Sequence, residues 1–207
     1  MTPRSRPLAS LVLTALLVLG ACSTAPPPIR LHTLMPAEPT PRDPAISGRP
    51  PVFVSLDPIR LPAQVDQPQW LVRLPDESLA SLEQERWASP LADELRQALL
   101  EQLAARFGVV EGRSPAPQAA PPLRIALELR RFDSLPGREA RIEGAWTVAG
   151  PAALRCSVFI REPATGGMAE LAAAHRRAVA RLAGAIGASL VAVPPASVPV
   201  CPVPEPR

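Results

Sequence analysis

The order of hydrophobic patterns along this chain predicts an α+β fold, a mostly antiparallel β-sheet with two main helices packed on one face. Two long stretches, 91–107 and 168–190, place apolar residues on one side of a helix. Several shorter stretches alternate apolar and polar residues, as strands with one buried face do. Prolines gather before residue 51, at 115–122 and after residue 193, where we expect linkers and tails.

Three short strands are expected before the first helix. Residues 29–34 alternate apolar and polar side chains and would dock on the edge of the domain. Residues 52–56 are β-branched and aromatic, and Pro58 confines the residues after this strand to an edge or a bend. Residues 69–74 form the third candidate strand.

The first helix has the clearest signals. Ser89 is expected to cap it, and Pro90 suits the first helical position. Asp93 and Glu94 place negative charge at the positive end of the helix dipole, with Glu94 off the apolar stripe. Gly108 ends the helix. We expect the stripe to cover the sheet, and it is made of Leu91, Leu95, Leu99 and Leu103.

The second half of the chain is expected to form a hairpin and a further strand. A short strand begins at Val109. Residues 123–132 alternate, Pro136–Gly137 forms a turn, and residues 141–148 return beside the first strand. Residues 154–160 provide the next strand, so an antiparallel arrangement with one buried face is expected.

The second helix is expected to depend on close packing. Gly184 and Gly187 weaken it as an isolated helix, so we expect close contact with a neighbouring element. His175 falls on its mainly apolar stripe, where a core or boundary position is expected.

The N-terminus resembles the signal and lipobox of bacterial lipoproteins. A basic start and an apolar run at 8–19, shorter than the roughly 20 residues of a spanning helix, precede the motif Leu19-Gly20-Ala21-Cys22. The resemblance implies cleavage before Cys22, a diacylglycerol on its thiol and an acylated new N-terminus. Ser23 stands where aspartate would signal inner-membrane retention, which implies export to the outer membrane. An ordinary secretory signal and a retained signal anchor stay open as alternatives.

These signals divide the chain into four segments. We expect a signal peptide at 1–21, an acylated N-terminus and proline-rich tether at 22–50, a periplasmic domain at 51–192, and a disordered proline-rich tail at 193–207.

Charge and composition exclude some partners and most enzyme chemistry. Removing the signal leaves arginines that nearly balance the 19 acidic residues, so no nucleic-acid partner is expected. The two histidines, His32 and His175, have no glycine-flanked serine elbow beside them, and no phosphate loop or metal-ligand cluster is present. Asp133 and Glu143 would face each other across the hairpin, as solvated strand residues. We expect neither enzyme activity nor a cofactor.

Two cysteines remain once Cys22 carries lipid. In an oxidising periplasm Cys156 and Cys201 are candidates for a disulfide. Cys156 is alternatively a small buried hydrophobe, and spacing alone does not decide between these two fates.

Taken together, the segments resemble the auxiliary lipoproteins of ABC-type intermembrane lipid transport, the PqiC-like family. The likeness spans almost the whole mature chain. Departures are His32, where the family usually has tyrosine, and Gln67, where a basic residue is common. The matching features, in order, are Cys22, His32-Thr33-Leu34, Leu61-Pro62-Ala63, Gln67-Pro68-Gln69, Leu71-Val72-Arg73, Trp87, Arg131-Phe132-Asp133, Pro136-Gly137, Ala145-Trp146 and the alanine-rich last helix.

The resemblance implies an outer-membrane-anchored periplasmic lipoprotein. Such a protein would dock to an MCE-domain protein, whose tunnel carries phospholipid between membranes beside an ABC permease and ATPase, and a homo-oligomer is compatible with that role. Two other functions stay open. One is a lipid-binding module that encloses an acyl chain. The other is a cell-envelope hydrolase, or its activator, that uses His32 or His175.

Overall fold

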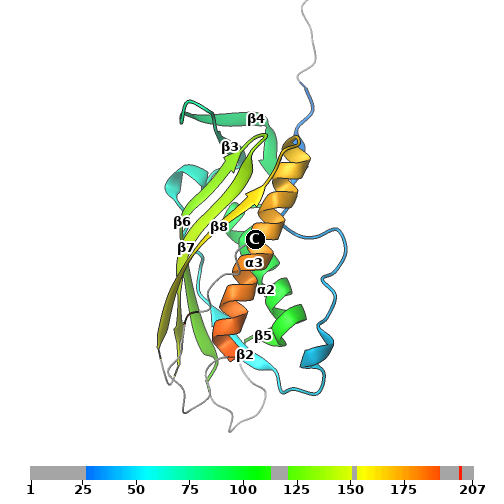
Figure 1. Ribbon diagram of the computed structural model, residues 1–207, viewed down its shortest axis with the longest axis vertical. Coiled ribbons are helices and arrows are strands. Elements are labelled where there is room, and N and C mark those ends of the chain that lie inside the picture. Colours follow the sequence, from blue (N-terminus) through cyan, green and yellow to red (C-terminus); the bar gives the residue numbers. More distant parts are fainter. Residues whose placement is uncertain (1–26, 113–120, 151–152, 192–200, 202–207) are drawn as a thin grey trace, which may run out of the picture.

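The computed structural model confirms the α+β class and describes residues 27–112, 121–150, 153–191 and 201. Two helices lie side by side on one face of a five-stranded sheet, and a three-stranded sheet sits at one end of the molecule (Figure 1). The expected single sheet is therefore divided in two. The signal peptide, the cysteine expected to carry lipid and most of the C-terminal tail lie outside the described residues.

The five-stranded sheet forms the main layer of the domain. Its long strands β6, β7 and β8 pair antiparallel, which confirms the predicted hairpin and third strand. At the other edge, the short strand β2 runs parallel to both β5 and β6. The order across the sheet is β5 (Val109–Glu111), β2 (Val52–Leu56), β6 (Leu123–Leu135), β7 (Glu139–Ala149) and β8 (Leu154–Pro163).

The three-stranded sheet, called the small sheet below, has the order β1 (Arg30–His32), β4 (Leu79–Trp87) and β3 (Gln69–Arg73). The expected edge strand near residue 30 is confirmed as β1, parallel to β4. Strand β4 was not predicted. Its sequence is rich in glutamate and glutamine, which have low strand propensity, and only pairing with β3 reveals its alternation.

Helices α2 (Leu91–Phe107) and α3 (Met168–Val191) match the expected positions. Gly108 ends α2 in the left-handed conformation, as predicted. The expected Ser89 cap is wrong, because Pro90 occupies the cap position and makes no side-chain cap hydrogen bond. The close packing expected at Gly187 is confirmed, since a Cβ atom there would lie 2.2 Å from the Phe107 ring on α2.

The position of Glu94 differs from the expected one on the solvated side of the helix. It is buried rather than solvated, and its carboxylate accepts hydrogen bonds from three groups. Thr33 Oγ1 donates at 2.6 Å, the Leu34 backbone N–H at 2.8 Å, and Ser89 Oγ at 2.9 Å. The burial is possible because every one of these donors offsets part of the cost of removing the charge from water.

The segment expected to be a tether is partly packed on the domain. The Asp43 backbone N–H donates to the Ala105 carbonyl at 2.9 Å, and Thr40 donates to Glu101 through both its backbone and its hydroxyl. The packed part of the chain therefore starts before residue 51, because polar groups of this segment find partners on α2. Two short 3-10 turns, Pro44–Ile46 and Ala63–Val65, complete the connections.

Candidate functional site

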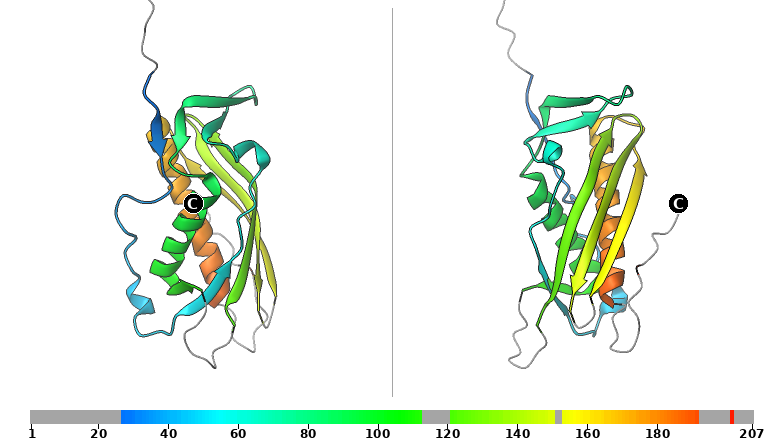
Figure 2. Two further views of the ribbon diagram at one scale, coloured as in Figure 1. Left: turned by 180° about the vertical axis from the view of Figure 1, so that it is seen from behind. Right: turned by 90° about the vertical axis from the view of Figure 1, so that its left-hand side faces the viewer.

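The face of the five-stranded sheet that carries no helix, called the open face below, gathers the charged side chains of its strands. Strand β8 shows the reason, because its residues alternate strictly between buried and exposed. Leu154, Cys156 and Val158 point to the core, whereas Arg155 and Ser157 point outward. In the view of Figure 2, right, strands β6, β7 and β8 lie in front of the helices.

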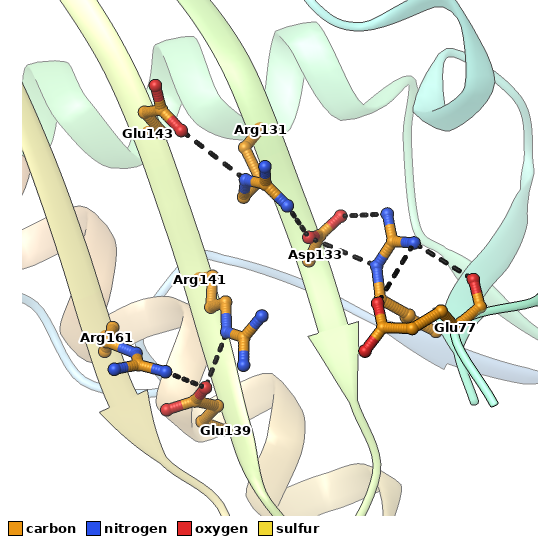
Figure 3. A network of polar contacts seen from close by, with 8 residues as sticks. Glu77, Arg131, Asp133, Glu139, Arg141, Glu143 and Arg161 are labelled. Atoms are coloured by element: carbon orange, nitrogen blue, oxygen red, sulfur yellow. Dashed lines mark hydrogen bonds and ion pairs between the residues drawn. The ribbon is translucent and has the colours of Figure 1, made fainter. Parts of the chain in front are cut away.

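One half of the open face carries a chain of ion pairs (Figure 3). Arg131 connects the two acidic residues that were expected across the hairpin, at 2.9 Å from Asp133 and 3.5 Å from Glu143. Arg73 of β3 approaches Asp133 from the other side at 3.3 Å and also pairs with Glu77. Asp133 is buried by these partners, so the expectation of a solvated carboxylate is wrong for it.

A second group of ion pairs lies beside the first on β7 and β8. Glu139 accepts a hydrogen bond from Arg141 at 2.5 Å and pairs with Arg161 at 3.2 Å (Figure 3). Burial opposes ionisation of Glu139, yet the hydrogen bond and charge of Arg141, with the charge of Arg161, lower the pKa of Glu139 below its ordinary value. This part of the surface is therefore fixed in one charged state at neutral pH.

The other half of the open face contains a hollow of about 510 Å³. Its wall is the segment Asp57–Arg60, which backbone hydrogen bonds to the carbonyls of Ile125 and Leu127 hold beside β6. Arg124 pairs with Asp57 at 2.9 Å, and this hydrogen bond raises the pKa of Arg124. The floor is made of the small side chains of Ala126, Ala145 and Thr147.

A second hollow of about 370 Å³ lies over β6, β7 and β8. Its lining includes Gly144, where a Cβ atom would approach the Leu129 side chain to 2.7 Å, so a larger residue at this position would collide with β6. Phe159, 50% exposed, stands at its border with Arg161 near its ring. The open face thus combines hollows with one exposed aromatic ring.

Three arginines around the two hollows are available to a partner. The side chains of Arg60, Arg130 and Arg155 have no hydrogen-bond or ion-pair partner among the described residues. Among the carboxylates in the described lining of the hollows, only Glu128 has no ion-pair partner and can offset the charge of these arginines. Arginine is enriched in protein interfaces because its guanidinium forms paired hydrogen bonds with carboxylates and stacks on aromatic rings. The open face is thus suited to binding an acidic protein surface.

Both histidines lie in a buried aromatic cluster rather than on this face. The rings of His32 and His175 both lie near Trp70, with centroids 4.8 and 6.0 Å from its ring centroid. His32 Nε2 contacts Glu85 at 2.6 Å, and Trp87 and Phe132 complete the cluster. The expected core position of His175 is confirmed, since its side chain is fully buried.

The contact between Ser134 and His175 superficially resembles a catalytic pair. Ser134 Oγ lies 2.8 Å from His175 Nε2, but it also accepts a hydrogen bond from Trp70 Nε1 at 2.7 Å. Both Ser134 and His175 are buried, and neither lines the hollows described above. A nucleophile needs access to substrate and a base oriented by a third group, and this pair has no such geometry.

The remaining expected site residues are the cysteines. Cys22 lies outside the described residues. The structure joins Cys156 of β8 to Cys201 in a disulfide with Cα atoms 5.5 Å apart. In the described part of the chain, no group of three His, Cys, Asp or Glu side chains is arranged to hold a metal ion. No helix in that part has both the length and the apolar character needed to span a bilayer.

Sequence reasoning did not identify the open face as a site. The available signal was the row of outward positions in 123–132 and 154–160, several of which are arginines. Reading that row requires the register between β6, β7 and β8 and the position of the Asp57–Arg60 wall, and neither can be deduced from the pattern of a single strand.

Two crystal structures share the fold. That of an uncharacterized protein matches with a TM-score of 0.58 and 16% identity, over 67% of this chain and 93% of the other. That of protein XCC0632 from Xanthomonas campestris matches with a TM-score of 0.55 and 19% identity, over 80% and 95%. No curated protein matches the chain.

The model of one protein family matches most of the sequence. Its description is ABC-type transport auxiliary lipoprotein component, and the match covers residues 32–187, which include strands β2 to β8, all of α2 and most of α3. The resemblance found in the sequence motifs is thereby confirmed. This protein belongs to the family of ABC-type transport auxiliary lipoprotein components.

Proposed function

We propose that this protein is an outer-membrane-anchored, periplasmic accessory subunit of an MCE/ABC-type phospholipid transport system, and that it acts by docking to the MCE-domain protein. The observation that carries the proposal is family membership over residues 32–187. The lipobox motif ending at Cys22 supports the lipid anchor. An anchored protein with no accessible catalytic pair among its described residues serves a transporter by binding, and we propose that it is not an enzyme.

The open face is the surface that best supports docking. It joins two hollows, an exposed aromatic ring at Phe159 and the guanidinium groups of Arg60, Arg130 and Arg155. Hot spots of protein interfaces are enriched in aromatic residues and arginine. Ion pairs hold the neighbouring charged side chains in place, so these side chains lose less conformational entropy when a partner binds. We therefore assign the docking of an acidic partner surface to this face.

The experiment is affinity purification of the full-length, acylated protein after crosslinking in its native envelope. Mass spectrometry then identifies bound proteins and bound lipids. We expect an MCE-domain protein without stoichiometric phospholipid. Phospholipid bound in stoichiometric amount, with no transporter protein, would contradict docking and favour a lipid carrier.

Substitutions that reverse the charge of arginines on the open face test, in the same experiment, whether this face is the docking surface. The double substitution of Arg130→Glu and Arg155→Glu should abolish recovery of the partner, because both guanidinium groups border the hollows. The matched control is Arg42→Glu with Arg49→Glu, two exposed arginines in the N-terminal segment beside α2. Equal recovery with both double variants would contradict the assignment of docking to the open face.

A further inference from the structure

Exposed hydrophobic side chains concentrate on the small sheet. Six large hydrophobic residues are exposed among the described residues, and four of them lie on this sheet or next to it. They form two pairs. Ile29 directly precedes β1 and Leu31 lies on it, and their side chains are 50% and 64% exposed. Leu74 and Leu79, 37% and 44% exposed, flank the turn between β3 and β4. We call these four residues the small-sheet patch.

The chain enters the domain at this same end. Pro27 is the first described residue, and the described N-terminal chain leaves the domain beside the small sheet (Figures 1 and 2). Cys22 precedes Pro27 by five residues. Even a fully extended chain of that length spans no more than about 18 Å. A lipid on Cys22 therefore holds the small sheet close to the lipid surface.

We propose that the small-sheet patch rests on the phospholipid surface that holds the acyl chains of Cys22. The inference depends on the lipid anchor of the proposed function and adds the orientation of the domain on the membrane. The short connection to Cys22 brings the patch to the surface, and the four apolar side chains lose their water contact in the headgroup region.

The charges around the patch decide which lipid surface it fits. Asp76 and Glu77 are exposed in the turn between Leu74 and Leu79, and Glu83 is exposed on β4. The exposed cation of the patch, Arg30 between Ile29 and Leu31, is paired with the Glu85 carboxylate. Carboxylates at this end repel anionic headgroups, so the contact is apolar rather than electrostatic. The small-sheet patch therefore rests on a zwitterionic phospholipid surface, and the strength of this contact should change little with salt concentration.

This contact orients the rest of the molecule. Helix α3 begins at the small-sheet end and runs toward the opposite end (Figure 1). Its 24 residues extend for about 36 Å. Strand β5, which carries Val110, lies at that far end, away from the lipid. The open face lies on the side of the sheet away from the helices, where a transport partner can reach it from the side.

The test measures the distance of three positions from the bilayer. Single cysteines replace Leu79, Val110 or Phe159 in the full-length acylated protein, and each carries a bimane fluorophore, with labelling performed without reductant to preserve the Cys156–Cys201 disulfide. The protein is placed in phosphatidylethanolamine/phosphatidylcholine vesicles that contain a lipid with a spin-labelled headgroup. Val110 and Phe159 are matched controls, because they are exposed to a similar degree as Leu79.

We expect quenching at position 79 to be several-fold stronger than at positions 110 and 159. Equal quenching at the three positions in acylated protein would overturn the inference and leave the lipid anchor intact. Quenching that rises with protein density rather than with quencher lipid would assign the patch to a second copy of the chain and also overturn it. A protein that mass spectrometry shows to be unacylated would instead refute the anchor in the proposed function, and the orientation with it.

Discussion

The Nε2 atom of His175 lies 2.8 Å from the Oγ atom of Ser134, in the centre of the aromatic cluster that joins the two sheets to α3. Trp70 of the small sheet donates a hydrogen bond to the same Oγ atom. Phe132 of the five-stranded sheet stacks on the imidazole, with ring centroids 4.2 Å apart. The Ser134 hydroxyl thus connects the five-stranded sheet, the small sheet and helix α3. Its stability requires a neutral imidazole, because a charged ring would be buried without a carboxylate in contact.

Acid sensitivity should follow from His175. Burial lowers its pKa to about 3, although the charge of Asp133 acts in the opposite direction. Between about pH 6.5 and pH 3 the unfolded chain binds a proton at this residue and the folded protein does not, so stability falls as pH falls. From pH 7 to pH 5, the wild type should lose about 2 kcal/mol more than His175→Gln, which cannot titrate.

Urea denaturation at the two pH values measures this difference. Glutamine retains an atom able to bond Ser134, so the variant tests titration rather than the loss of the contact. The same pH dependence in both proteins would show that His175 does not govern acid sensitivity.

The Glu94 carboxylate should hold the N-terminal segment on α2. Glu94→Ala leaves Thr33, Leu34 and Ser89 without their shared acceptor, and we expect a loss of about 2 to 4 kcal/mol with faster proteolysis of residues 27–50. Glu83→Ala, at an exposed position of β4, is the control and should change stability by less than about 0.5 kcal/mol. Similar melting temperatures for the two variants would refute this role.

The two glycines of α3 should respond oppositely to alanine. At Gly187 the added Cβ meets the Phe107 ring at 2.2 Å, so Gly187→Ala should destabilise by about 1 to 3 kcal/mol. At Gly184 the nearest atoms belong to the Arg106 guanidinium at 3.3 Å, which can move aside. Gly184→Ala should be neutral or stabilise by up to about 1 kcal/mol through helix propensity. Thermal denaturation that ranks the two variants in the reverse order would contradict the packing.

The disulfide should stabilise the domain by restricting its unfolded state. Cys156 and Cys201 are separated by 45 residues, and a loop of this size corresponds to about 4 kcal/mol in the chain-entropy model. Reductant should lower the denaturation midpoint of the wild type and leave Cys201→Ser unchanged. A wild type that reductant does not affect would show that the two thiols are not paired in the protein.

The elements with strong periodicity were predictable from sequence. The stripes of α2 and α3 and the alternation of β6 and β8 depend on local spacing. Gly108 ends α2 through a left-handed backbone conformation that glycine adopts without strain. Strand β4 and the buried position of Glu94 were not predictable in the same way. The strand depends on pairing with β3, and the carboxylate depends on Thr33 and Leu34, which are 61 and 60 residues away.

The candidate site was predictable only in part. A lipobox is a local motif, so Cys22 can be identified without coordinates. The open face is assembled from β6, β7, β8 and the Asp57–Arg60 segment, and its hollows exist only where those elements meet. The pairing of Arg73 with Asp133 joins residues 60 positions apart and has no signature in either segment.

Site-specific photo-crosslinking in the native envelope tests whether the open face docks to an MCE-domain protein. A photoreactive residue replaces Ser157, which lines the second hollow of the open face, in the full-length acylated protein. The control replaces Gln97, an exposed residue of α2 on the helical side of the domain. If the open face is the docking surface, a covalent product should form between position 157 and an MCE-domain protein, and none should form from position 97. Absence of a transport protein at position 157, or equal products at both positions, would contradict docking through the open face.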